Sequence, residues 1–149
     1  MRDLPKLNLP AIRLRGRRNG DRIEVWCDVR RCWLVLTPEE WVRRHLAAYL
    51  VAACGADPLH LVEEYPVPLN GQPQRADVVV TDRQGRPLLL AECKAPNVAI
   101  GTATLDQAVR YNSVVGARYV VLTNGLTHCC YRMEEGRCEP LEGFPRLDE

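Results

Sequence analysis

Three charged residues beside apolar runs are the residues of this sequence best suited to chemistry. Asp77 stands near the start of the run ADVVVT, and Glu92 and Lys94 close the run PLLLAECK. Glu92 and Lys94 are two residues apart, so on a strand their side chains project to one face while Cys93 points to the other. Charges in an apolar layer are costly unless they are paired or bound to a metal. Two carboxylates and one ammonium group leave a net negative pocket, which favours a hard cation with oxygen ligands, Mg²⁺ or Mn²⁺.

Two strands must position these groups. Residues 76–81 and 87–94 are nearly continuous in apolar character, which indicates central strands buried on both faces. Residues 82–86 between them predict a hairpin connection. Antiparallel pairing places the start of one strand beside the end of the next, so Asp77 is expected beside the acid and the amine that close the second strand. A purely structural salt bridge between Lys94 and one acid is the alternative interpretation.

Two helices are predicted around these strands. The first begins at TPEE, where Thr37 can act as the N-cap and Glu40 can complete a capping box. It ends at Gly55, a residue type typical of helix C-terminal caps. The second helix is expected over residues 102–115. Glu63 and Glu64 lie between the first helix and the central strands as further acids without an assigned role.

The remaining strands are expected to be short. They are predicted at residues 11–15, 22–27, 31–36, 60–67, 118–124 and 128–133. Asn19-Gly20 and Asn70-Gly71 predict hairpin turns. A crossover through the second helix makes its flanking strands parallel neighbours with a right-handed connection. The sequence therefore predicts an α/β fold with a mixed central sheet flanked by helices, and with an N-terminal β extension.

The length of 149 residues suits one domain, with an arm and β extension over 1–36 and a core over 37–133. No apolar run approaches the roughly 20 residues that cross a bilayer, and the N-terminus lacks the pattern of a signal peptide. We therefore expect a cytoplasmic protein without a membrane partner. The seven cysteines include no Cys-x-x-Cys pair, which favours reduced, mostly buried thiols. A zinc site is the alternative, with poor ligand spacing, from His128, Cys129, Cys130 and Cys138.

Charge is uneven along the chain although the net charge is only +1. Residues 1–60 hold 11 Lys/Arg and 7 Asp/Glu, whereas residues 61–149 hold 9 and 12. A solvated basic face is one interpretation of the arginine-rich half, and a patch that contacts phosphates is the other. On the second interpretation, Arg43 and Arg44 are predicted to contact DNA.

Several segments together resemble a known family. TPEEWVRRHL, RADVVVTDRQGRPLLLAECKAP, DQAVRYN and YVVLTNG are similar to segments of the N-terminal nuclease domain of type I restriction enzyme R subunits. That domain lies within the PD-(D/E)xK superfamily, and the resemblance covers roughly residues 37–133. Ala76 replaces the nominal proline before the aspartate. The resemblance implies a restriction-endonuclease-like core in the order helix, three strands, helix, strand.

The resemblance also implies roles for individual residues. Asp77 and Glu92, with the backbone carbonyl of Cys93, would bind Mg²⁺ or Mn²⁺, and Lys94 would orient the attacking water. In similar nucleases a glutamate of the first helix lies near the metal, which makes Glu40 a candidate ligand, although its capping role explains it equally well.

Gln107 and Tyr111 match a Gln-x-x-x-Tyr motif. Residues four apart share one face of a helix, and the resemblance places this face at the active site and the DNA backbone. The alternative is that Tyr111 belongs to the core and Gln107 is solvated.

The predicted activity is therefore Mg²⁺-dependent endonucleolytic hydrolysis of DNA. No phosphate-binding loop of the Gly-x-x-x-x-Gly-Lys-Ser/Thr type is present, so DNA translocation and target recognition would belong to a separate motor or specificity protein. Two alternatives remain open. The first is a DNA-binding module that does not cut. The second is an assembly module in which apolar surface on the N-terminal strands pairs two copies into a homodimer. Trp26 and Trp33 are placed where such packing could occur, although burial in the core is the role that we expect for them.

Overall fold

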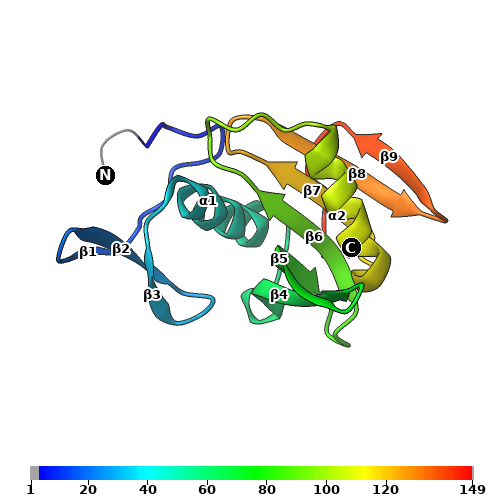
Figure 1. Ribbon diagram of the computed structural model, residues 1–149, viewed down its shortest axis with the longest axis horizontal. Coiled ribbons are helices and arrows are strands. Elements are labelled where there is room, and N and C mark those ends of the chain that lie inside the picture. Colours follow the sequence, from blue (N-terminus) through cyan, green and yellow to red (C-terminus); the bar gives the residue numbers. More distant parts are fainter. Residues whose placement is uncertain (1–3, 149) are drawn as a thin grey trace.

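The computed structural model describes residues 4–148, which form two β-sheets and two long helices (Figure 1). Helix α1 spans Pro38–Ala53 and helix α2 spans Thr102–Val115, as the sequence predicted. Within the described range, no helix has the length and apolar character needed to cross a membrane.

A small antiparallel sheet in the order β1-β2-β3 precedes α1. Its strands are β1 (Gly16–Asn19), β2 (Arg22–Cys27) and β3 (Cys32–Val35). The predicted turn at Asn19-Gly20 is present, with Asn19 paired to Arg22. The predicted strand over 11–15 is wrong, because the first strand begins at Gly16, which pairs with Val25 of β2.

Helix α1 is bounded by the residues that the sequence indicated. The Thr37 hydroxyl accepts a hydrogen bond from the backbone N–H of Glu40 at 3.0 Å, which caps the helix N-terminus. At the other end Gly55 adopts a φ of +83°, a left-handed conformation that stops the helix. Leu46 and Leu50 are fully buried on the face between these caps.

The larger sheet has six strands in sequence order, β4 to β9. They are β4 (Leu61–Leu69), β5 (Gln72–Thr81), β6 (Pro87–Cys93), β7 (Tyr119–Thr123), β8 (His128–Glu134) and β9 (Arg137–Leu141). All neighbours are antiparallel except β6 and β7, which are parallel because α2 connects them. The fold is thus the predicted mixed α/β arrangement. Strand β9 was not predicted, and it extends the sheet past residue 133.

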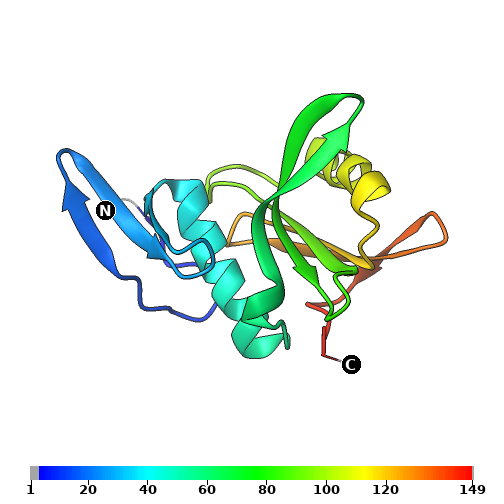
Figure 2. The same cartoon turned by 90° about the horizontal axis from the view of Figure 1, so that it is seen from below.

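Two apolar layers hold the sheet between the helices. On one face Val78, Ala91 and Cys93 pack with the buried side chains of α1. On the other face Val79 and Leu90 pack with α2. Figure 2 shows this arrangement from below, with the three-stranded sheet on the far side of α1. Strands β5 and β6 are therefore buried on both faces, as their continuous apolar sequences indicated.

Candidate active site

Asp77 and Glu92 lie opposite each other at one end of the central strands. The pairing of Val78 with Ala91 sets the register that makes them neighbours. The carboxylate of Glu92 accepts a hydrogen bond from the backbone N–H of Asp77 at 2.8 Å. The carboxylate of Asp77 accepts one from the backbone N–H of Cys93 at 2.7 Å. Each carboxylate is thus fixed through one oxygen, Oε2 of Glu92 and Oδ2 of Asp77.

Burial makes the two carboxylates costly to ionise together. Desolvation raises the pKa of Glu92 to about 8, and the charge of Asp77 adds to the rise while Lys94 opposes it. Desolvation also raises the pKa of Asp77 to about 6, against the hydrogen bond from the Cys93 N–H, which lowers it. Glu92 is only 5% exposed. A bound cation would stabilise the ionised form of two such buried acids.

Lys94 follows the last residue of β6. Its backbone N–H donates to the carbonyl of Thr123 at 2.8 Å, which fixes the chain where β6 ends beside β7. The side chain is half-buried, and its positive charge acts on the Glu92 carboxyl. Cys93 between them is buried in the layer against α1, as the alternation of strand side chains predicted.

Gln107 and Tyr111 face this end of the sheet from α2. The Gln107 amide donates to the Tyr111 hydroxyl at 3.2 Å, and that hydroxyl donates to Gln74 Oε1 on β5 at 3.3 Å. Burial raises the pKa of the Tyr111 phenol, and the charges of Glu92 and Asp77 raise it further. The tyrosine ring is buried in the apolar layer beneath α2. Tyr111 thus joins the core and also presents its hydroxyl toward the two acids.

Gln74 was missed by the sequence analysis. The predicted strand began at residue 76, so Gln74 was treated as loop, whereas β5 begins at Gln72. No local signal distinguished it, because only the packing of α2 on β5 brings its amide to Tyr111.

Arg43 and Arg44 lie inside the molecule. Both are buried, at 8% and 6% exposure. Arg43 Nη2 lies 2.6 Å from Glu40 Oε1, and Arg44 forms ion pairs with Glu40 and Glu63. The Glu63 side chain is completely buried. These guanidinium groups neutralise acids inside the molecule, and this geometry favours a structural role over the predicted contact of Arg43 and Arg44 with phosphates.

Glu40 belongs to the same buried cluster. Its Oε2 accepts from Arg44 at 2.9 Å and from Arg43 at 3.2 Å, while its Oε1 also contacts Arg43. Both carboxylate oxygens are therefore occupied. The geometry favours ion pairing over the predicted metal-binding role. It also favours ion pairing over a hydrogen bond from the backbone N–H of Thr37 to the Glu40 carboxylate, which would complete the predicted capping box.

Glu64 brings a third acid to this end of the sheet. It lies between the pairs Glu63–Val78 and Tyr65–Ala76 on β4 and β5, opposite Asp77. Its φ of +55° is uncommon for a residue with a side chain, and such strain tends to gather at functional sites. Its carboxylate accepts from Arg43 Nη1 at 2.8 Å, and that nitrogen also lies 3.9 Å from Asp77 Oδ1. Arg43 therefore connects the buried cluster to the candidate site.

A small polar pocket of about 120 Å³ opens here. It is lined by Thr37, Glu39, Glu40, Arg43, Glu64, Asp77 and Cys93. Its size suits an ion with a few waters. Across residues 4–148, no three His, Cys, Asp or Glu side chains gather closely enough to hold a metal by themselves. This finding speaks against the cysteine zinc site, whereas the predicted magnesium site needs only two acidic side chains and a backbone carbonyl.

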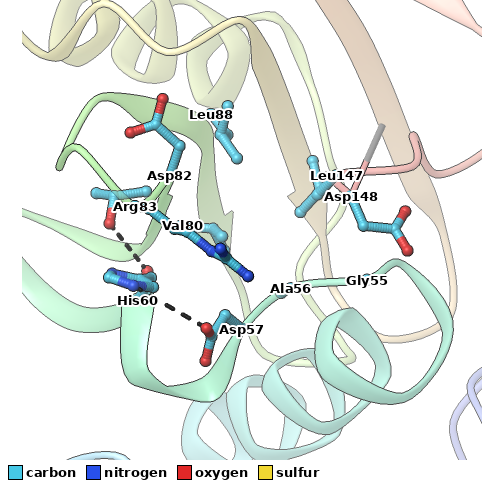
Figure 3. Close-up of a pocket in the computed structure, with 11 residues that line it drawn as sticks. Gly55, Ala56, Asp57, His60, Val80, Asp82, Arg83, Leu88, Leu147 and Asp148 are labelled. Atoms are coloured by element: carbon cyan, nitrogen blue, oxygen red, sulfur yellow. Dashed lines mark hydrogen bonds and ion pairs between the residues drawn. The ribbon is translucent and has the colours of Figure 1, made fainter.

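A larger pocket of about 470 Å³ lies beyond the opposite ends of the same strands (Figure 3). Asp57 and His60 approach it from the segment after α1, and Asp82 and Arg83 from the hairpin after β5. None of the predicted site residues lines it. The smaller pocket is lined by Asp77 and Cys93 but not by Glu92, Lys94, Gln107 or Tyr111, so the candidate active site extends beyond this pocket.

Comparison with known proteins places the chain in a family. Residues 38–145 match the family described as the N terminus of the type I restriction enzyme R protein. A structure described as a fragment of an HsdR subunit of a type I restriction enzyme from Vibrio vulnificus YJ016 is similar to this chain. The TM-score is 0.55 at 23% identity, over 74% of this chain and 24% of that chain.

The crystal structure of the type IIG restriction endonuclease BpuSI has a TM-score of 0.48 at 20% identity, over 72% of this chain and 13% of that one. That likeness is too slight to carry an argument. No curated protein matches the sequence. This chain thus corresponds to about a quarter of the length of the similar HsdR fragment. Because the family match covers most of the sequence, the chain belongs to the family of type I restriction enzyme R protein N-terminal regions.

Proposed function

We propose that this chain is a metal-dependent nuclease that hydrolyses phosphodiester bonds in DNA. The observation that carries the proposal is the facing pair of buried carboxylates, Asp77 and Glu92, with Lys94 one residue beyond β6. Two like charges at the end of a buried strand pair lower the stability of the fold unless they serve a ligand. Membership in a restriction enzyme family supports DNA as the substrate.

The chemistry of the donor set fits Mg²⁺ or Mn²⁺. Asp77, Glu92 and the backbone carbonyl of Cys93 would supply hard oxygen ligands, as such ions prefer. A bound divalent cation lowers the pKa of a water molecule and neutralises charge on the scissile phosphate. The hydrogen bonds from the backbone N–H groups of Cys93 and Asp77 fix the two carboxylates before any ion arrives.

Lys94 and the α2 residues would act on the substrate. The Lys94 ammonium group would orient the attacking water and stabilise the negative charge that develops on the phosphate oxygens. The Gln107 amide and the Tyr111 hydroxyl, already linked to each other and to Gln74, would hold the DNA backbone. The sequence shows no helix-turn-helix or zinc-finger motif for reading bases, so target selection would belong to a separate specificity or motor protein.

Plasmid cleavage tests the proposal. Supercoiled DNA is incubated with the full chain in Mg²⁺, in Mn²⁺ and in EDTA, and nicked and linear products are followed over time. Lys94→Ala and Asp77→Asn are compared with Lys6→Ala, which removes the only other lysine of the chain. Lys94→Ala is expected to lower the rate by about 10²–10³, the typical effect of removing one group that stabilises a transition state.

Tyr111→Phe provides a finer test, because it removes only the hydroxyl that joins Gln107 to Gln74. We expect slower cleavage with an unchanged unfolding transition. Full cleavage by Lys94→Ala would refute the proposal. DNA binding with no metal-dependent cleavage by the wild type would replace the proposal with the non-catalytic alternative.

A further inference from the structure

The sheet formed by β1, β2 and β3 lies outside the part of the chain that matches the family, which begins at residue 38. In Figures 1 and 2 it stands at the outer side of α1, away from the six-stranded sheet. Residues 4–37 carry eight Lys/Arg and three Asp/Glu, whereas residues 38–149 carry 11 and 15. The positive charge of the protein is therefore concentrated on an element that the family region does not include.

One face of this sheet gathers arginine and tryptophan side chains. Arg17 pairs with Glu24 across β1 and β2, and Trp26 pairs with Trp33 across β2 and β3. The backbone N–H of Trp26 donates to the carbonyl of Arg15 at 2.8 Å, so Arg15 lies beside this tryptophan. Directly paired residues share a face of a sheet. We call the surface formed by Arg15, Arg17, Trp26 and Trp33 the arginine–tryptophan face.

The opposite face of the sheet is buried. Val25 and Cys27 are 2% and 0% exposed, and the Cys27 thiol contacts Arg44 of α1 and Glu63 of β4. Alternation along β2 therefore places the arginine–tryptophan face on the other side of the sheet. Arg15 and Trp26 of this face also line a pocket of about 600 Å³ with Ala47 and Ala48 of α1, and the two indole side chains are half-buried.

The aromatic rings hold the guanidinium groups in place. The guanidinium carbon of Arg17 lies 4.3 Å from the ring centroid of Trp33, and that of Arg15 lies 5.2 Å from Trp33 and 5.4 Å from Trp26. The two indole rings meet edge to face at 5.5 Å. Each such cation–π contact contributes about 0.5–1 kcal/mol at an exposed site. The indole rings thus hold the guanidinium groups of Arg15 and Arg17 against the sheet.

The charged groups of the face remain accessible. The Arg17 side chain is 45% exposed, and Arg15 is exposed as well. Glu24 accepts from Arg17 Nε at 2.7 Å, so the terminal nitrogens of Arg17 still point to other partners. Arg13, Arg18 and Arg22 are further exposed cations on this segment, against the exposed acids Asp21 and Asp28. Fixed guanidinium forks suit the bidentate recognition of phosphate.

We propose that the arginine–tryptophan face binds the phosphodiester backbone of nucleic acid without reading its sequence. The charge of residues 4–37 is complementary to a polyanion, and the exposed guanidinium groups suit contacts with phosphates, which carry no sequence information. The proposal rests on the proposed function, because a DNA-cleaving domain must hold its substrate. Binding at this face requires no metal, so the two proposals can fail separately.

Fluorescence anisotropy in EDTA tests this proposal with the full chain. A labelled oligonucleotide is titrated as a single strand and as a duplex, from about 50 mM to about 200 mM salt. The variant Arg15→Gln/Arg17→Gln removes two cations of the face. Arg132→Gln/Arg137→Gln on β8 and β9 is the matched control, since it removes two exposed arginines from the other sheet.

The Arg15→Gln/Arg17→Gln variant is expected to bind at least about tenfold more weakly at low salt. The negative slope of log binding constant against log salt concentration should become less steep. The change should be roughly 1.8 for duplex or roughly 1.4 for single strands, which corresponds to two lost phosphate contacts. The control should stay near the wild type. Arg15→Lys/Arg17→Lys keeps the charge and should retain most of the slope. It therefore separates a charge effect from a loss of fold.

Three results would overturn the proposal. The first is a glutamine variant with wild-type affinity and slope. The second is binding that changes with base composition. The third is a wild type that binds neither form of DNA and instead dimerises in light scattering, which would make this face a protein interface. Loss of plasmid cleavage with intact binding would refute only the nuclease assignment.

Discussion

Replacing Glu92 by glutamine is expected to stabilise the metal-free protein while it removes the proposed metal site. Glutamine keeps the shape of the side chain and an oxygen that can accept from the backbone N–H of Asp77, which now bonds to the carboxylate at 2.8 Å. It removes the charge that burial and Asp77 make costly. The change therefore separates the stability of the fold from its function.

The magnitude follows from the pKa of the group. In the folded protein the pKa of Glu92 is raised from 4.5 to about 8, so the folded state holds a proton that the unfolded chain has released. Stability must then fall as the pH rises through this interval. Each pKa unit corresponds to about 1.4 kcal/mol, so the free energy of unfolding should fall by about 3 kcal/mol between pH ~5.5 and pH ~8. The pKa of Asp77 is raised to about 6, so this residue adds to the loss of stability in the acidic part of the pH range.

Urea denaturation in EDTA across this pH range measures the effect. We expect Glu92→Gln to match the wild type near pH ~5 and to exceed it by about 3 kcal/mol near pH ~8. Added Mn²⁺ should stabilise the wild type at the higher pH, by about 2.7 kcal/mol at a hundred times its dissociation constant, but not the variant. Glu139→Gln, on the exposed strand β9, is the control. A wild-type stability that is flat or rises over this interval would refute the reasoning.

Three further predictions concern the metal site, the buried cluster and one helix end. Apparent Mn²⁺ affinity should rise about tenfold per pH unit between pH ~6 and pH ~8, because the facing carboxylates must lose a proton to bind the ion; a pH-independent titration would contradict this. Arg44→Met should cost about 3 kcal/mol in urea denaturation because it takes a partner from the fully buried Glu63 carboxylate, and a loss below about 1 kcal/mol would oppose the buried pairing. Gly55→Ala should lower the thermal midpoint more than Gly20→Ala does. Both positions have positive φ, but only at Gly55 would the new Cβ meet another side chain, that of Asp148 at 2.4 Å, so equal losses would argue against this packing.

The sequence predicted the elements that carry the site because their signals are local. Continuous apolar runs marked β5 and β6, and the cap at Thr37 and the glycine at residue 55 bounded α1. The two-residue spacing of Glu92 and Lys94, together with hairpin pairing, was enough to expect Asp77 as their neighbour. These inferences needed only alternation and antiparallel register, which a short stretch of sequence determines.

What could not be predicted depends on contacts between distant elements. Strand β9 contains Pro140 and is almost wholly exposed, so it lacks the apolar alternation that marks a strand. Arg43 and Arg44 read as surface cations because nothing near them in the sequence reveals their partners, and Glu63 reaches Arg44 only when β4 packs beside α1. The same holds for Glu64, whose left-handed backbone and position opposite Asp77 emerge only from the pairing of β4 with β5.

Direct measurement of Mn²⁺ binding tests the central claim that Asp77 and Glu92 together hold a divalent cation. Electron paramagnetic resonance of free Mn²⁺ at pH ~8, where the facing carboxylates can ionise, counts the ions taken up per chain. Wild type should bind one ion, Asp77→Asn should bind it at least about tenfold more weakly, and Asp106→Asn on the exposed side of α2 should bind it unchanged. A wild type that takes up no Mn²⁺, or an Asp77→Asn variant that binds as tightly as the wild type, would contradict the account.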